Sequence, residues 1–132
     1  MLSTFTVSST AKYKYYNRNP DRVHLKDCVC RAISTATGLN YTAIEKLLEL
    51  SATACKCEPL NVDCYKNLLE GVFNLPRFDC GFTKTVKDVA EEHPLDKVII
   101  RVDQHLTSAL YGVVLDIWDC SDELVDCFWI VS

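Results

Sequence analysis

The sequence predicts an α+β domain in which N-terminal helices pack on a C-terminal antiparallel sheet. Two observations support this prediction. Apolar residues recur with helical spacing from residue 27 to about residue 92, whereas residues 97–131 contain short runs rich in Val, Ile, Leu and aromatic side chains, which is typical of strands. Helices followed by strands, without alternation of the two, indicate the α+β class.

The chain has the size of one domain. Its 132 residues are 48% hydrophobic, so a single unit spanning residues 1–132 can bury a core without depending on disulfides. Residues 1–12 are a candidate flexible arm. We expect the polar and aromatic segment 10–21 to form a loop or an edge strand.

Helix signals define the first part of the chain. The first predicted helix carries an apolar face around Ile33 and ends at Gly38, because glycine tolerates the left-handed conformation that terminates helices. The second helix begins after Asn40, a residue type that caps helix N-termini. Asn61 is expected to cap a third helix in the same way, and that segment ends at Pro76.

A short fourth helix is predicted from Thr85 to a point before Pro94. Asp88 lies three residues after Thr85 and can take the acidic position of a capping box. Proline disfavours helical geometry at the residue before it, which sets the end of this helix.

Four strands are expected next, at residues 98–102, 106–111, 113–118 and 124–131. Tyr111-Gly112 has the pattern of a two-residue hairpin turn, in which glycine supplies a positive φ. The resulting register puts His105 and Asp116 on one face of the sheet as diagonal neighbours, about 7–8 Å apart at the backbone. Their side chains would then be within reach of each other.

Charge and hydropathy exclude several functions. The net charge is −4 and the isoelectric point is near 5.3, which argues against nucleic acid as a partner. No stretch approaches the roughly 18 apolar residues of a membrane span. Residues 1–10 lack the pattern of a signal peptide, so we expect a cytoplasmic protein with no membrane partner.

The eight cysteines are expected to be reduced thiols, most of them in the core. Cys55, Cys57 and Cys64, with Cys28 and Cys30, could be combined into a zinc site. The C-x-C spacing and the lack of a following H-x3–5-H disfavour that site, so no metal and no cofactor are expected.

Cys28 is the candidate nucleophile. A cysteine in the first turn of a helix is exposed to the positive end of the helix dipole, which lowers the thiol pKa. His105 could serve as the general base and Asp116 as the carboxylate that orients the imidazole. Asp119 would point to the other face of a continued strand, and it stays as the alternate acid in case of a bulge.

The chain resembles a group of small phage and bacterial proteins with papain-like cysteine peptidase folds. The similarity rests on N-P at residues 19–20, D-C-V-C-R-A-I-S from Asp27, and T-G-L-N-Y from Thr37. It continues with Q-H-L-T-S-A from Gln104, the turn glycine, and D-I-W-D-C from Asp116. The resemblance spans residues 13–131.

This resemblance implies Cys28 as nucleophile, His105 as general base and acid, and Asp116 as orienting acid. Papain-like enzymes also use a side-chain amide before the nucleophile to bind the oxyanion. The usual six-residue spacing falls on Arg22, a charged guanidinium, so Asn19 is the candidate oxyanion donor.

The expected function is that of a thiol-dependent hydrolase acting on a protein or peptide substrate through an acyl-enzyme. It could be a cysteine peptidase, an isopeptidase or an amidase, in a bacterial host cell if it is phage-encoded. The alternative is a catalytically silent papain-like module that binds or inhibits a host protein. The oligomeric state is left open.

Overall fold

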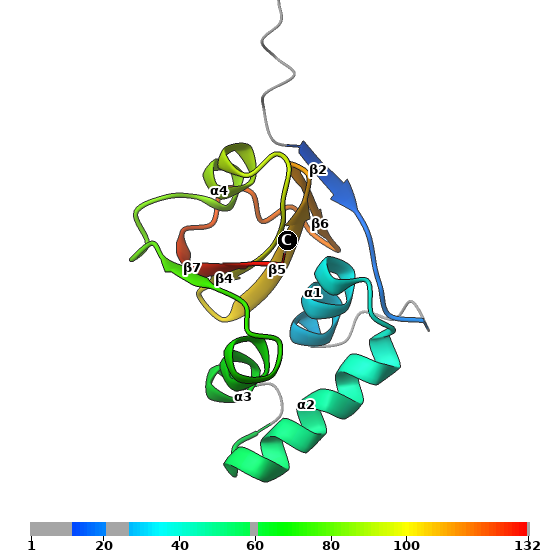
Figure 1. Ribbon diagram of the computed structural model, residues 1–132. Helices are drawn as coiled ribbons and strands as arrows, with labels where there is room; N and C mark the ends of the chain where they lie inside the picture. Colours follow the sequence, from blue (N-terminus) through cyan, green and yellow to red (C-terminus); the bar gives the residue numbers. More distant parts are fainter. Residues whose placement is uncertain (1–11, 21–26, 59–60, 132) are drawn as a thin grey trace, which may run out of the picture.

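The computed structural model describes residues 12–20, 27–58 and 61–131. Within them the chain forms one six-stranded sheet with helices on both faces (Figure 1). The α+β class is therefore confirmed. Of the candidate arm at residues 1–12, residues 1–11 lie outside the described residues, as does Arg22, whereas Lys12 begins a strand and is not part of a flexible arm.

The helices begin and end largely where the capping signals indicate. Their bounds are α1 Cys28–Thr37, α2 Tyr41–Cys55, α3 Val62–Lys66, the π-helical η2 Asn67–Val72, and α4 Val86–Glu92. Gly38 ends α1 with a φ of 76°. Asn40 and Asn61 accept hydrogen bonds from the first backbone N–H groups of α2 and α3, and Thr85 with Asp88 forms a complete capping box.

The sheet has the order β2-β6-β5-β4-β7-β3. Its strands are β2 Lys12–Tyr15, β3 Arg77–Asp79, β4 Lys97–Val102, β5 His105–Leu110, β6 Val113–Asp116 and β7 Val125–Ile130. All neighbours are antiparallel except β2 and β6. The N-terminal segment thus forms an edge strand, one of the two expected outcomes. The three-residue edge strand β3 was not predicted.

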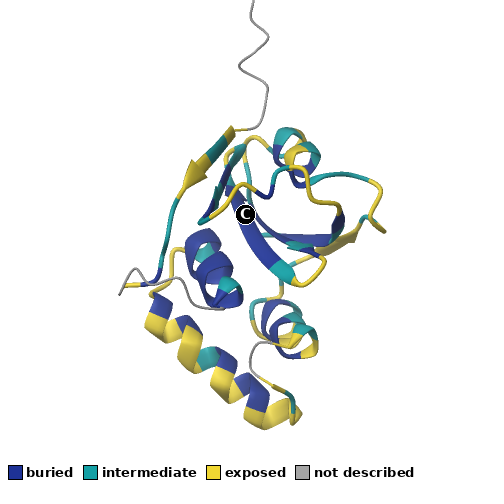
Figure 2. Cartoon of the chain, turned by 180° about the vertical axis from the view of Figure 1, so that it is seen from behind, coloured by how far each residue is buried: buried dark blue, intermediate teal, exposed yellow. Residues whose placement is uncertain are grey.

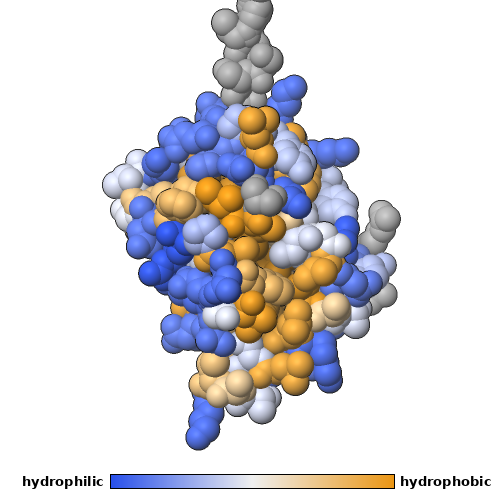
Figure 3. Space-filling view, in the orientation of Figure 1, coloured by the Kyte–Doolittle hydropathy of each residue, from blue (hydrophilic) through white to orange (hydrophobic). Residues whose placement is uncertain are grey.

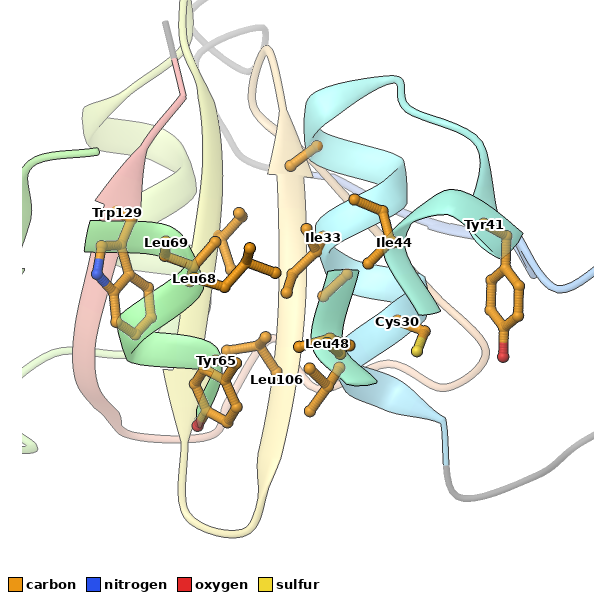
Figure 4. Close-up of a cluster of buried hydrophobic side chains, with 14 of the residues drawn as sticks. Cys30, Ile33, Tyr41, Ile44, Leu48, Tyr65, Leu68, Leu69, Leu106 and Trp129 are labelled. Atoms are coloured by element: carbon orange, nitrogen blue, oxygen red, sulfur yellow. The ribbon is translucent and has the colours of Figure 1, made fainter. Parts of the chain in front are cut away.

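The two faces of the sheet carry separate cores. On one face α1, α2 and α3 cover a cluster that includes Ile33, Leu69, Leu106 and Trp129 (Figure 4). On the other face α4 covers a second cluster, which includes Val89. The expectation that the N-terminal helices pack on the sheet is correct for α1 to α3, but α4 lies on the opposite side (Figure 1).

Helix α1 is the most enclosed helix of the fold. Its residues Val29 to Ala36 are all buried, whereas α2 is buried along one stripe only (Figure 2). A central helix of this kind lies between the sheet and α2, so the side chains at its N-terminus have fixed surroundings. Cys28 is the first residue of this helix.

The hairpin between β5 and β6 follows the predicted register. Tyr111 and Gly112 form the turn with φ values of 53° and 83°, and Leu110 pairs with Val113. Both turn residues are left-handed, as a type I′ hairpin turn requires. This register places the start of β5 beside the end of β6.

The expectation of reduced thiols is wrong for one pair, because Cys57 and Cys64 form a disulfide. The end of α2 and the start of α3 hold their Cα atoms 5.9 Å apart, within the range that a disulfide spans. These two sulfurs are therefore not zinc ligands. Cys30 is a buried core residue, as expected.

In the described part of the chain, we find no helix that combines the length and the apolar character needed to cross a bilayer.

Candidate active site

The N-terminus of α1 and the first residue of β5 bring Cys28 and His105 together. Helix α1 packs against β5, Cys28 and His105 line the same groove, and the His105 side chain and the Leu106 backbone are near enough to lower the pKa of the Cys28 thiol. The two residues are 77 positions apart in the chain. The juxtaposition expected for a cysteine nucleophile and its base is therefore present.

His105 also contacts the carboxylate that the hairpin register indicated. Its Nε2 lies 2.7 Å from Oδ2 of Asp116. The side chains of His105 and Asp116 are only 11% and 4% exposed, so the pair is largely shielded from water. Because Nε2 is engaged by Asp116, Nδ1 is the ring nitrogen left for Cys28.

Asp119, the alternate acid, lies elsewhere. Its carboxylate is exposed and accepts hydrogen bonds from the backbone and side chain of Ser121. Strand β6 ends at Asp116, so the chain has turned away before it reaches Asp119. Asp116 is the carboxylate that meets the imidazole.

The three groups shift one another's ionisation. Burial raises the pKa of Cys28, but hydrogen bonds from His105 and Leu106 outweigh it and hold the pKa below its ordinary value. Burial lowers the pKa of His105, yet hydrogen bonds to Asp116, Cys120 and Cys28 raise it to about 11. Burial raises the pKa of Asp116, and the hydrogen bond from His105 brings it below its usual range.

These pKa shifts have one effect in common. Each favours the charged form of its group, so a thiolate, an imidazolium and a carboxylate would stabilise one another. The imidazolium between two anions is the central charge of the site. An arrangement of this kind provides an ionised sulfur nucleophile and a proton donor next to it.

A buried ion-pair network centred on Arg31 contacts Asp116 and the N-terminus of α1. Arg31, one turn after Asp27 on α1, pairs with the Asp27 carboxylate, and its Nη2 lies 3.7 Å from Oδ1 of Asp116. The guanidinium links the helix that carries the thiol to the strand that carries the orienting acid.

Asn19 belongs to the same network. Its Nδ2 donates to Oδ2 of Asp27 at 3.0 Å and lies 3.5 Å from the Tyr41 hydroxyl, which itself donates to Oδ2 of Asp27 at 2.7 Å. Asn19 is buried. These contacts direct its amide toward Asp27, and its role as an oxyanion donor stays a prediction.

Trp118 covers one side of the imidazole. Its ring centroid lies 5.0 Å from that of His105, and the indole is 41% exposed. Trp129, by contrast, is fully buried. Trp118 follows the end of β6, which places it over the site rather than in the core.

A groove opens beside the thiol. It has a volume of about 290 Å³ and is lined by Cys28, His105, Val62, Tyr65, Arg101 and Gln104, among others. A larger hollow of about 520 Å³ lies between residues 15–20 and the start of α2, and neither Cys28 nor His105 lines it. The smaller groove is therefore the one that gives access to the reactive groups.

Cys120 is the site residue that sequence reasoning missed. Its Sγ lies 3.7 Å from Oδ2 of Asp116 and within 4.8 Å of a ring nitrogen of His105. The only signal in the sequence was its place at the end of D-I-W-D-C. Since Cys120 is buried, a buried apolar role and a polar role could not be separated without the fold.

No family model, curated protein or solved structure matches this chain. Its site is therefore interpreted from its own chemistry.

Proposed function

We propose that the protein is a thiol-dependent hydrolase of the papain-like type, which cleaves a peptide, isopeptide or related amide bond in a protein or peptide substrate. One observation supports this above all others. Cys28 and His105 line one groove, the His105 ring lowers the pKa of the Cys28 thiol, and Nε2 of His105 lies 2.7 Å from the Asp116 carboxylate. This is the geometry of a nucleophile, a base and a group that orients the base.

The reaction would proceed through an acyl-enzyme. The Cys28 thiolate attacks the carbonyl carbon, forming a C–S bond and a tetrahedral oxyanion. Collapse of this intermediate breaks the C–N bond, and His105 gives its proton to the leaving amine. Water then attacks the thioester, His105 accepts a proton from that water, and the Cys28 sulfur leaves. Asp116 holds the ring in position throughout.

The N-terminus of α1 can stabilise the oxyanion. The first backbone N–H groups of a helix have no partner within the helix, and the Asp27 side chain makes no capping hydrogen bond to them. Asp27 is instead engaged by Arg31 and Tyr41. The backbone N–H of Cys28 is thus a candidate donor, with Asn19 as the candidate side-chain donor.

Cleavage of a mixed peptide library tests the proposal. New termini, detected by mass spectrometry, are expected with the natural protein and are expected to vanish with Cys28→Ala. Cys127→Ala is the matched control, because Cys127 is buried in the core away from the groove. Equal cleavage by the natural protein and by Cys28→Ala would contradict the proposal.

A catalytically silent binding module is the second candidate. The amide of Asn19 is directed to Asp27, and Figure 3 shows a band of apolar surface across one face of the molecule. Exposed apolar surface of this kind marks interaction sites. Under this alternative, Cys28→Ala would keep the full biological effect of the protein, whereas a hydrolase would lose it.

A further inference from the structure

We propose that His105, Asp116 and Cys120 form a binding site for Zn²⁺, and that zinc bound there arrests the thiol site. The imidazole nitrogen, the carboxylate oxygen and the sulfur of these residues all lie within 4.8 Å of one another. The site differs from the C-x-C cysteines considered in the sequence. Metal binding stands on this cluster alone, whereas the arrest of catalysis rests on the proposed function.

The donor set selects the metal. One sulfur, one imidazole nitrogen and one carboxylate oxygen suit Zn²⁺, while Mg²⁺ and Ca²⁺ prefer oxygen ligands alone. Three protein ligands leave a fourth tetrahedral position for water. Nε2 of His105 and Oδ2 of Asp116 are 2.7 Å apart, and a metal ion between them requires a separation larger by several tenths of an ångström.

The surroundings of Asp116 favour this use of its carboxylate. Oδ1 accepts a hydrogen bond from the backbone N–H of Ile117 at 2.7 Å and lies 3.7 Å from Arg31. Oδ2 is the oxygen that faces His105 and Cys120. Such outer contacts fix the orientation of a ligand in metal sites. The cluster thus has one carboxylate oxygen anchored and the other directed at the two remaining donors.

Charge and access are also consistent with an ion at this point. Asp116 and Cys120 are buried, and the cation would meet a carboxylate and a sulfur that gives up its proton on binding. His105 lines the groove beside Cys28, so one of the three donor residues borders a space that is open to solvent. Zn²⁺ would exchange water ligands for the three protein donors on entering.

Binding would change the catalytic pair in a defined way. Zn²⁺ replaces the proton on Nε2 of His105 and the proton on the Cys120 thiol, and both protons go to solvent. Asp116 then ligates the metal instead of orienting the ring. His105 would no longer carry the two ring protons of an imidazolium beside the Cys28 sulfur. Proton transfer to the leaving amine is therefore blocked.

Cobalt is the probe that tests the metal site directly, since Co²⁺ in a sulfur site gives a thiolate-to-metal charge-transfer band. The full chain with Cys28→Ser serves as the background, because it removes the sulfur on the other side of His105. We expect one Co²⁺ per chain and a charge-transfer band. Adding Cys120→Ala should abolish the band and weaken Co²⁺ binding by about 10-fold or more.

Two further variants show whether loss of the band comes from loss of the Cys120 sulfur itself. Cys120→Ser keeps the size of the side chain and should also lose the band, so the result does not depend on whether Cys120→Ala folds. Cys127→Ala removes another buried sulfur and should keep the band. A band that survives both Cys120 variants, or no binding of Co²⁺ in the background protein, would overturn the site.

Activity separates this inference from the proposed function. If the natural protein cleaves peptides, Zn²⁺ should inhibit it, and Cys120→Ala should need about 10-fold more Zn²⁺ or higher for the same inhibition. Cleavage without a Cys120-dependent metal site would refute the inference and leave the function intact. Co²⁺ binding through Cys120 in a protein that cleaves nothing would uphold the metal site and reject the hydrolase.

Discussion

The reactivity of Cys28 toward iodoacetamide is the most direct prediction of the site. An ordinary thiol with a pKa near 8.5 is about 3% thiolate at pH 7, whereas the lowered pKa of Cys28 favours the thiolate. Full ionisation would raise the reactive fraction about 30-fold. A thiolate of lower pKa is a weaker nucleophile, which reduces the advantage to about 10-fold.

Cys55 provides an internal reference, because it is an exposed free cysteine in the same chain. At pH 7 Cys28 should be alkylated about 10-fold faster than Cys55, although Cys28 is the less exposed of the two. At a pH near 10 an ordinary thiol is also ionised, so the advantage of Cys28 should disappear. Isotope-coded iodoacetamide and peptide mapping give both rates from one sample.

The advantage should depend on His105. Removing the imidazole in His105→Ala takes away a hydrogen bond and a positive charge from the sulfur, and the Cys28 rate at pH 7 should fall to about that of Cys55. His93→Ala is the matched control, since His93 ends α4 and pairs with Asp96. Equal rates for Cys28 and Cys55 in the natural protein, or a Cys28 rate unaffected by His105→Ala, would refute the assignment.

Four further variants test the orienting acid and the fold. Asp116→Asn should lower kcat/KM about 100-fold or more because the ring loses its anionic partner, whereas Asp119→Asn should change it less than about twofold; equal losses in peptide-cleavage assays would contradict the geometry. Leu69→Ala, at a fully buried position, should lower the free energy of unfolding in urea by about 2–5 kcal/mol. Thr85→Ala should lower it by about 1 kcal/mol in the same measurement, through loss of the α4 cap, and a cost below the error of the measurement would show that the cap is dispensable.

The elements that the sequence predicted well are those with local causes. Asn40, Asn61 and Thr85 cap helices through contacts within three residues, so their signals are complete in a short window. The hairpin turn at Tyr111 is equally local. Because side chains alternate along strands, a correct turn was sufficient to place His105 and Asp116 on one face.

The features that escaped prediction depend on distant partners. β3 is a strand only because it pairs with β7, about 50 positions away, and its three residues carry too little pattern to be recognised alone. The Cys57–Cys64 disulfide depends on how α2 and α3 pack. The apolar face of α4 suits either side of the sheet, so periodicity could not indicate which one it covers.

The site could be predicted only in part, because its residue types are visible in the sequence but its contacts depend on packing between distant segments. Cys28 and His105 were selected by the chemistry of their residue types, and their juxtaposition was an expectation based on resemblance. Cys120 was not selected, because a buried cysteine is commonly a small apolar residue. Its polar contacts follow from the turn after β6, which brings the sulfur back to Asp116.

Arg31 explains why the motif around Cys28 includes a buried charge. A buried ion pair is seldom a net gain in stability over apolar packing, so a role beyond stability is the better reason for this one. The guanidinium lies between two buried carboxylates, Asp27 on α1 and Asp116 on β6. Without it, two anions would repel each other across the junction on which the thiol depends. The Arg31 guanidinium thus joins the helix that carries the nucleophile to the strand that carries the orienting acid.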